Sequence, residues 1–107
     1  MDEDHIREIF AGLGEVTIRR MFGGRGIYHH GLIVALEVDG EVLLKADSVS
    51  APNFEAAGAR QWVYDGQKNR RPTAMPYWSI PERALDDADE LALWTRRAYE
   101  AARRSAK

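Results

Sequence analysis

The sequence contains no cysteine, so disulfide bonds, thiol nucleophiles and thiolate metal ligands are excluded within its 107 residues. It also has no apolar run near the roughly 18 residues that a membrane-spanning helix needs. The N-terminus, Met1-Asp2-Glu3-Asp4, is acidic and lacks the basic start of a signal peptide. We therefore expect a soluble cytoplasmic protein with no membrane partner.

A strong excess of charge of one sign is missing as well. The chain has 15 basic and 17 acidic residues and a formal net charge of −2. This balance gives no overall attraction to nucleic acid or to an acidic membrane surface. A chain of this length can bury one hydrophobic core, so we predict a single domain over residues 1–107.

The segment Gly23-Gly24-Arg25-Gly26 lies between two β-forming segments. Glycine tolerates the positive φ of a tight turn, so the segment predicts a β-hairpin. The other interpretation is a phosphate nest closed by Arg25, and it is disfavoured because no helix N-terminus follows. Further turn signals delimit strands at 16–22, 26–29, 32–38, 42–46, 62–64 and 75–79.

Helical periodicity marks three segments around these strands. A short first helix has Ile6 and Phe10 on one face and Asp2 as its N-cap. A short crossover helix surrounds Phe54, with Ser48 and Ser50 as candidate caps. The fold class is therefore predicted to be α+β, with an antiparallel β-meander sheet on which the N-terminal, crossover and long C-terminal helices pack.

The last helix is the best marked. Asp87 and Glu90 have the spacing of a capping box. Leu91, Trp94 and Ala98 share one half of the helical wheel and are predicted to pack inward. The charged residues of the opposite half are predicted to be solvated; they include Arg97, Glu100 and Arg104.

The hairpin around Asp39-Gly40 is apolar on both faces, which is unusual for an antiparallel sheet with one solvated side. A two-residue type I′ turn would pair Leu36 with Leu43, Val34 with Lys45 and Ala35 with Leu44. We expect both faces to be covered, by the chain's own helices or by a second subunit. The predicted interaction residues are Val34, Leu36, Leu43 and Lys45, and the expected partner is a protein or a second copy in a homodimer.

Catalytic and metal-binding patterns are weak. No Ser, His and carboxylate have a defensible spacing for nucleophilic catalysis. Adjacent His29 and His30 would point to opposite faces of a strand, with no third ligand near. We predict no enzymatic activity, no catalytic residues, no cofactor and no metal.

Nucleic-acid binding is the alternative function. Basic residues flank aromatic ones on the last predicted hairpin, a composition typical of a base-stacking platform. The candidate residues are Arg60, Lys68, Arg70, Arg71, Tyr77 and Trp78. The acidic balance of the whole chain makes this the less favoured interpretation.

Several of these segments resemble one known family. They are Arg20-Met21-Phe22-Gly23-Gly24 with Gly26 and Tyr28, Gly31 before an apolar strand, Leu44-Lys45-Ala46-Asp47, Met75-Pro76-Tyr77-Trp78 with Pro81, and Leu91 to Ala102. Together they are similar to the TfoX N-terminal-domain family, named after bacterial regulators of natural competence. The resemblance implies a compact α+β fold and a role in transcriptional regulation, and it carries over no catalytic residues. Longer relatives have a second, helical domain, which we do not expect in these 107 residues.

Overall fold

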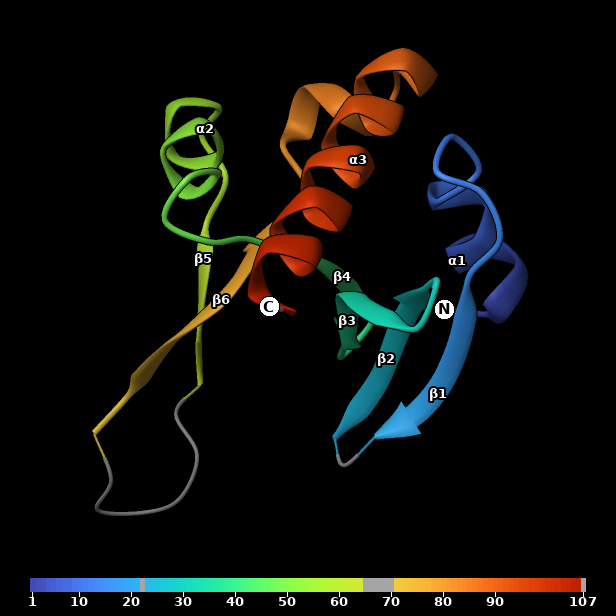
Figure 1. Cartoon of the computed structure of the whole chain (residues 1–107), viewed down its shortest axis with the longest axis horizontal. Coiled ribbons are helices and arrows are strands. Elements are labelled where there is room, and N and C mark those ends of the chain that lie inside the picture. Colours follow the sequence, from blue (N-terminus) through green and yellow to red (C-terminus); the bar gives the residue numbers. More distant parts are fainter. Residues whose placement is uncertain (22, 65–70, 107) are drawn as a thin grey trace.

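The computed structural model describes residues 1–21, 23–64 and 71–106 (Figure 1). Its α+β fold confirms the predicted class. The elements are α1 (Glu3–Ile9), β1 (Thr17–Met21), β2 (Gly24–His29), β3 (Leu32–Val38), β4 (Glu41–Lys45), α2 (Ala51–Ala56), β5 (Gln61–Tyr64), β6 (Thr73–Ser79), a 3-10 turn (Glu82–Ala84) and α3 (Ala88–Ser105). Phe22, which ends the first predicted strand, lies outside the described residues.

The six strands form one antiparallel sheet in the order β1-β2-β3-β4-β6-β5. The first four strands are the predicted meander. The chain then passes through α2 to the outer strand β5 and returns inward, so that β6 pairs with β4. The edges of the sheet are therefore β1 and β5.

The β3–β4 hairpin has the predicted register. Leu36 lies opposite Leu43 and Ala35 opposite Leu44. Asp39 and Gly40 form the turn with φ of 51° and 82°, and two positive φ values are what a type I′ turn requires. In the neighbouring β1–β2 hairpin, Gly23 has a φ of 86°, as expected for a turn glycine.

A β-bulge changes the predicted faces of β3. Ile27 pairs with Ala35 but Tyr28 pairs with Ile33, so Val34 is an extra residue between them. An extra residue shifts the alternation of side chains. Val34 and Ala35 are consequently both fully buried in the core. The expectation that Val34 shares a face with Leu36 is wrong for this reason.

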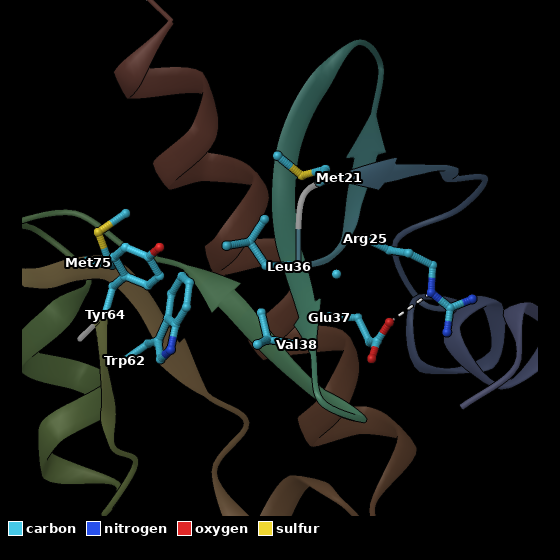
Figure 2. A pocket seen from close by; sticks show the side chains of 10 residues that line it. Met21, Arg25, Leu36, Glu37, Val38, Trp62, Tyr64 and Met75 are labelled. Atoms are coloured by element: carbon cyan, nitrogen blue, oxygen red, sulfur yellow. Dashed lines mark hydrogen bonds and ion pairs between the residues drawn. The ribbon is translucent and has the colours of Figure 1, made fainter. Parts of the chain in front are cut away.

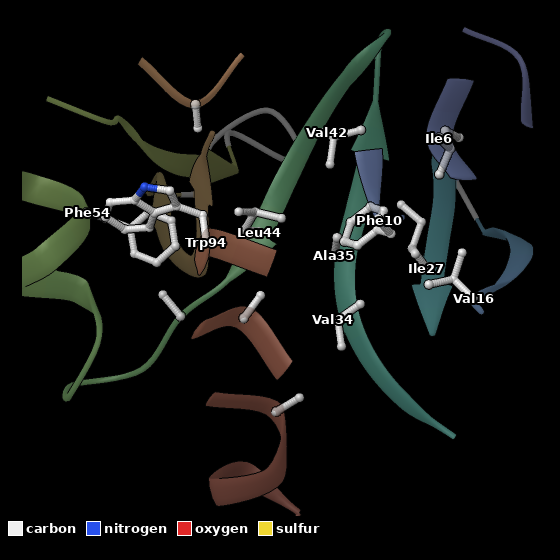
Figure 3. Close-up of a cluster of buried hydrophobic side chains, with 14 residues drawn as sticks. Ile6, Phe10, Val16, Ile27, Val34, Ala35, Val42, Leu44, Phe54 and Trp94 are labelled. Atoms are coloured by element: carbon white, nitrogen blue, oxygen red, sulfur yellow. The ribbon is translucent and has the colours of Figure 1, made fainter. Parts of the chain in front are cut away.

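All three α-helices lie on the same side of the sheet (Figure 1). The helix α3 packs mainly on β3 and β4, the central strands. Between the layers lies a cluster of buried apolar side chains, drawn in Figure 3: Ile6, Phe10, Val16, Ile27, Val34, Ala35, Val42, Leu44, Ala46, Phe54, Ala84, Trp94, Ala98 and Ala102. Both faces are expected to be covered, by helices or by a second subunit; in the described part of the chain the helices cover one face, and cover by a second subunit stays a prediction.

The N-terminus of α3 is capped as predicted, by Asp87. Its carboxylate accepts hydrogen bonds from the backbone N–H groups of Asp89 and Glu90. The Glu90 side chain does not close the capping box; it accepts a hydrogen bond from the indole N–H of Trp94 at 3.3 Å. That carboxylate thus satisfies the polar atom of a fully buried tryptophan.

The rest of α3 largely follows the predicted wheel. Ala98 is fully buried like Trp94, and Leu91 is partly buried against the core. Arg104 is exposed, whereas Arg97 and Glu100 are half-buried rather than fully solvated. Arg97 lies with its guanidinium 4.6 Å from the centre of the Trp94 ring, which explains its partial burial.

The helix α2 is capped differently from the prediction. Ser50 occupies the N-cap position but its side chain makes no capping hydrogen bond. Instead, Asp47 accepts hydrogen bonds from the backbone N–H groups of Val49 and Ser50. Asp47 therefore holds the turn that leads into α2. None of the helices in the described residues is both long and apolar enough to cross a membrane.

Candidate interaction surface

The sheet face opposite the helices carries an apolar groove of about 280 Å³ (Figure 2). Leu36 and Val38 of β3 form its floor. Met21 stands at the end of β1, and Trp62, Tyr64 and Met75 form the opposite wall on the β5–β6 hairpin. We call these six residues the groove. It joins two hairpins that are far apart in sequence.

Strand pairing explains why the groove is hollow. Gly26 lies between Arg19 and Leu36 in one cross-strand row that continues to Leu43. A Cβ atom on Gly26 would come within 2.7 Å of the Met21 sulfur. The absence of a side chain there lets Met21 fold over β2 beside the groove.

Two of the six groove side chains are unusually exposed for their type. Met21 is 43% exposed and Tyr64 is 48% exposed. Trp62 and Tyr64 contact each other edge to face, with ring centres 5.8 Å apart. Aromatic and methionine side chains on an uncovered surface are typical of protein contact sites.

Two cations lie on the same face, each over an aromatic ring. The Arg19 guanidinium is 5.5 Å from the centre of the Tyr28 ring, and the Lys45 ammonium is 5.2 Å from that of Tyr77. Burial, together with the neighbouring Tyr28, raises the pKa of Tyr77 above its ordinary value. Tyr77 is thus neutral at physiological pH and presents its ring to Lys45.

Arg25 and Glu37 line the back of the groove but point to the other side of β3 (Figure 2). The Arg25 Nε atom donates to a Glu37 carboxylate oxygen at 2.7 Å. Burial alone would raise the pKa of Glu37, but hydrogen bonds from Arg25 and from the Gly40 N–H outweigh it and hold the pKa below its ordinary value. The Arg25 guanidinium also donates to the Met1 carbonyl. Arg25 is therefore engaged within the chain, which further disfavours the interpretation of Gly23-Gly24-Arg25-Gly26 as a phosphate nest closed by Arg25.

The four predicted interaction residues lie in different places. Leu36 is half-buried in the groove floor, and Leu43 beside it is 3% exposed. Lys45 is half-buried over Tyr77. Val34 belongs to the core beneath the helices. Three of the four thus share the open face, and their role in binding stays a prediction.

The described residues of the nucleic-acid alternative, Arg60, Arg71, Tyr77 and Trp78, are not all on one face of the sheet. Arg60 donates to Glu41 at 2.7 Å. Tyr77 and Trp78 are adjacent on β6 and point to opposite faces: Trp78 stacks on Phe54 in the helix layer, with ring centres 6.1 Å apart. Arg71 is exposed. Lys68 and Arg70 lie outside the described residues.

The imidazole rings of the adjacent His29 and His30 stack on each other, with centres 4.0 Å apart and an angle of 18° between their planes, so the expectation that they point to opposite faces is wrong. His29 is 6% exposed and its Nδ1 lies 2.7 Å from the Glu15 carbonyl oxygen, whereas His30 is exposed. Tyr99 contacts both rings edge to face. In residues 1–21, 23–64 and 71–106, no group of three or more His, Asp or Glu side chains is placed to hold a metal ion.

Sequence reasoning missed most of the groove. The sequence places Trp62 and Tyr64 only among the aromatic residues of the base-stacking alternative, although their spacing of two puts both on one face of a strand. Met21 and Met75 gave no signal, because their contact with the groove depends on how strands distant in sequence are arranged.

These features define a class: a small two-layer α+β module with one face covered by helices and an apolar groove on the other. The family model for the TfoX N-terminal domain matches residues 8–102. The chain therefore belongs to the TfoX N-terminal domain family. No curated protein sequence matches it.

Proposed function

We propose that this chain is a non-enzymatic regulatory module that acts by binding a protein, either another protein or a second copy of itself. Its family membership supports a regulatory role, with a link to transcription as the resemblance implies. The observation that carries the proposal is the groove, an apolar surface on a sheet face that no helix of the described residues covers. Exposed apolar surface of this kind marks protein contact sites.

Solution mass, measured by light scattering over a wide range of protein concentration, tests self-association. If the mass rises with concentration, Leu36→Asp and Tyr64→Asp should both return the protein to a monomer, because each places a charge in an apolar contact. Leu85→Asp is the matched control, since Leu85 is 61% exposed and lies outside the sheet. Tyr64 is exposed enough that its substitution should leave the fold intact, which circular dichroism checks.

A second titration with single-stranded and duplex oligonucleotides tests the alternative. Nucleic-acid binding that falls steeply with salt and is lost on charge reversal at Arg70 and Arg71 would contradict the proposal. Association that is unaffected by both groove variants would also contradict it, because the contact would then lie elsewhere.

A further inference from the structure

Two cations on the open face of the sheet, Arg19 and Lys45, lie close to the groove without an ion-pair partner among the described residues. On β1, Arg19 is two residues from Met21 and therefore lies on the same face of the sheet. On β4, Lys45 is two residues from Leu43 and shares the open face with it. Neither cation is paired with a carboxylate among the described residues, whereas Arg25, Arg60 and Arg104 each are. Stacking on Tyr28 and Tyr77 holds both cations in place at the surface.

Two glutamates near this face, Glu37 and Glu41, are already engaged. Glu37 points into the helix layer, where it binds Arg25. Glu41, at the end of the β3–β4 hairpin, accepts a hydrogen bond from Arg60. Glu37 and Glu41 are thus paired, whereas Arg19 and Lys45 on the open face are not, in the described part of the chain.

This asymmetry disfavours a second copy of the chain as the occupant. In a two-fold dimer the same surface meets itself. Arg19 and Lys45 of both copies would then be desolvated against a surface whose Glu41 is already paired with Arg60, and burying an unpaired charge is costly. A partner with negative charge beside apolar side chains avoids that cost.

Nucleic acid also carries negative charge, but the groove suits it less well. Leu36, Val38 and the two methionines Met21 and Met75 are aliphatic, and they cannot stack on bases as aromatic rings do. Binding to nucleic acid gains most of its free energy from contacts with many phosphates, whereas Arg19 and Lys45, unpaired among the described residues, supply two cations beside the groove. An apolar segment with a few carboxylates matches both features.

We propose that the groove binds a short acidic, apolar segment of another protein. Its apolar side chains would contact Leu36, Val38 and Trp62, and its carboxylates would pair with Arg19 and Lys45. This inference rests on the proposed function and names its partner class. The two methionines adapt their shape easily, so the groove can accept different apolar side chains.

A display library of short random peptides, selected against the whole chain, tests the inference. We expect the enriched peptides to combine apolar side chains with an excess of Asp and Glu. Fluorescence anisotropy with labelled peptides should show binding weakened at least about tenfold by the double variant Arg19→Glu/Lys45→Glu, because like charges then oppose each other. Arg96→Glu, on the exposed face of α3, is the control and should change little. Thermal melting confirms that each variant is folded.

The other outcomes separate this inference from the proposed function. Enriched peptides that are apolar but not acidic, and that lose binding in Tyr64→Asp, would overturn the inference and leave the interaction module standing. Self-association through the groove, with no peptide enriched, would do the same. If no peptide that depends on the groove is enriched, and if oligonucleotide binding weakens steeply with salt, both the inference and the proposed function are overturned.

Discussion

The Arg104 guanidinium near the end of α3 donates two hydrogen bonds to the carboxylate of Asp47, at 2.6 and 3.0 Å. The two residues are 57 positions apart in sequence. Because Asp47 also holds the turn into α2, this pair connects α3 to the turn between β4 and α2. Two parallel hydrogen bonds fix the relative orientation of the groups as well as their distance.

The pair makes stability depend on pH. The hydrogen bonds from Arg104 hold the pKa of Asp47 well below its ordinary value of 3.8, against the opposing effect of burial. The pair therefore stabilises the fold fully above that ordinary value, and the contribution is lost as the pH falls below it. Asp47→Asn should lower the denaturation midpoint near pH 7, and its difference from the parent should shrink below about pH 4.

Denaturant titrations at several pH values measure this effect. Arg104→Lys should fall between the parent and Asp47→Asn, because lysine keeps the charge but cannot form two parallel hydrogen bonds. Glu55→Gln is the control, since Glu55 is exposed and makes no ion pair within the described residues. A difference between parent and Asp47→Asn that is constant across the pH range would contradict the prediction.

A second prediction concerns the close approach of β2 to β3. A Cβ atom on Gly24 would lie 2.2 Å from the carbonyl oxygen of Glu37, so Gly24→Ala must displace backbone. We expect a loss of about 1–3 kcal/mol in the free energy of unfolding, or more. Gly23 has open space around its Cα and a positive φ that asparagine tolerates. Gly23→Asn is therefore the control: it strains the backbone at a positive φ but meets no neighbouring atom, so it should cost less than Gly24→Ala. Equal losses in the two variants would show that sterics at Gly24 do not matter.

Trp94 is expected to be the most costly side chain of α3 to truncate. Its side chain is fully buried, and the centre of its ring lies 4.8 Å from the centre of the Phe54 ring. Its indole N–H donates a hydrogen bond to the Glu90 carboxylate. Trp94→Ala should lower the free energy of unfolding by about 3–5 kcal/mol. Leu93→Ala should change it by about 0.5 kcal/mol or less, because Leu93 is 41% exposed. Melting of Trp94→Ala within error of the parent would contradict this packing.

The comparison of sequence and structure shows which features are local. The strands, the Asp39-Gly40 turn and the Asp87 cap depend on neighbouring residues, and the sequence predicted all of them. The bulge at Val34 depends instead on how β3 pairs with β2, and strict alternation could not reveal it. The Asp47–Arg104 pair was missed for the same reason, because it needs α3 to be placed on the sheet.

The candidate site divides in the same way. Leu36 and Leu43 could be paired from the hairpin turn alone, and their register is confirmed. The wall formed by Trp62 and Tyr64 could not be placed, because β5 reaches its edge position only after the chain passes through α2. The apolar character of the hairpin thus indicated a contact surface, and only the arrangement of strands shows where its groove lies.

The last prediction separates protein binding from nucleic-acid binding by salt. Binding to six or more phosphates should weaken about a thousandfold or more between roughly 50 and 200 mM salt, because counterions are released. Binding through the groove depends mainly on apolar contact and on two cations, so we expect it to weaken less than about tenfold over that range. Charge reversal at Arg70 and Arg71 should leave this binding largely intact, whereas Leu36→Asp should abolish it. Anisotropy titrations at each salt concentration measure both. A steep salt slope that disappears with the Arg70 and Arg71 changes would assign the binding to nucleic acid, since only phosphate contacts made by these two arginines produce both effects.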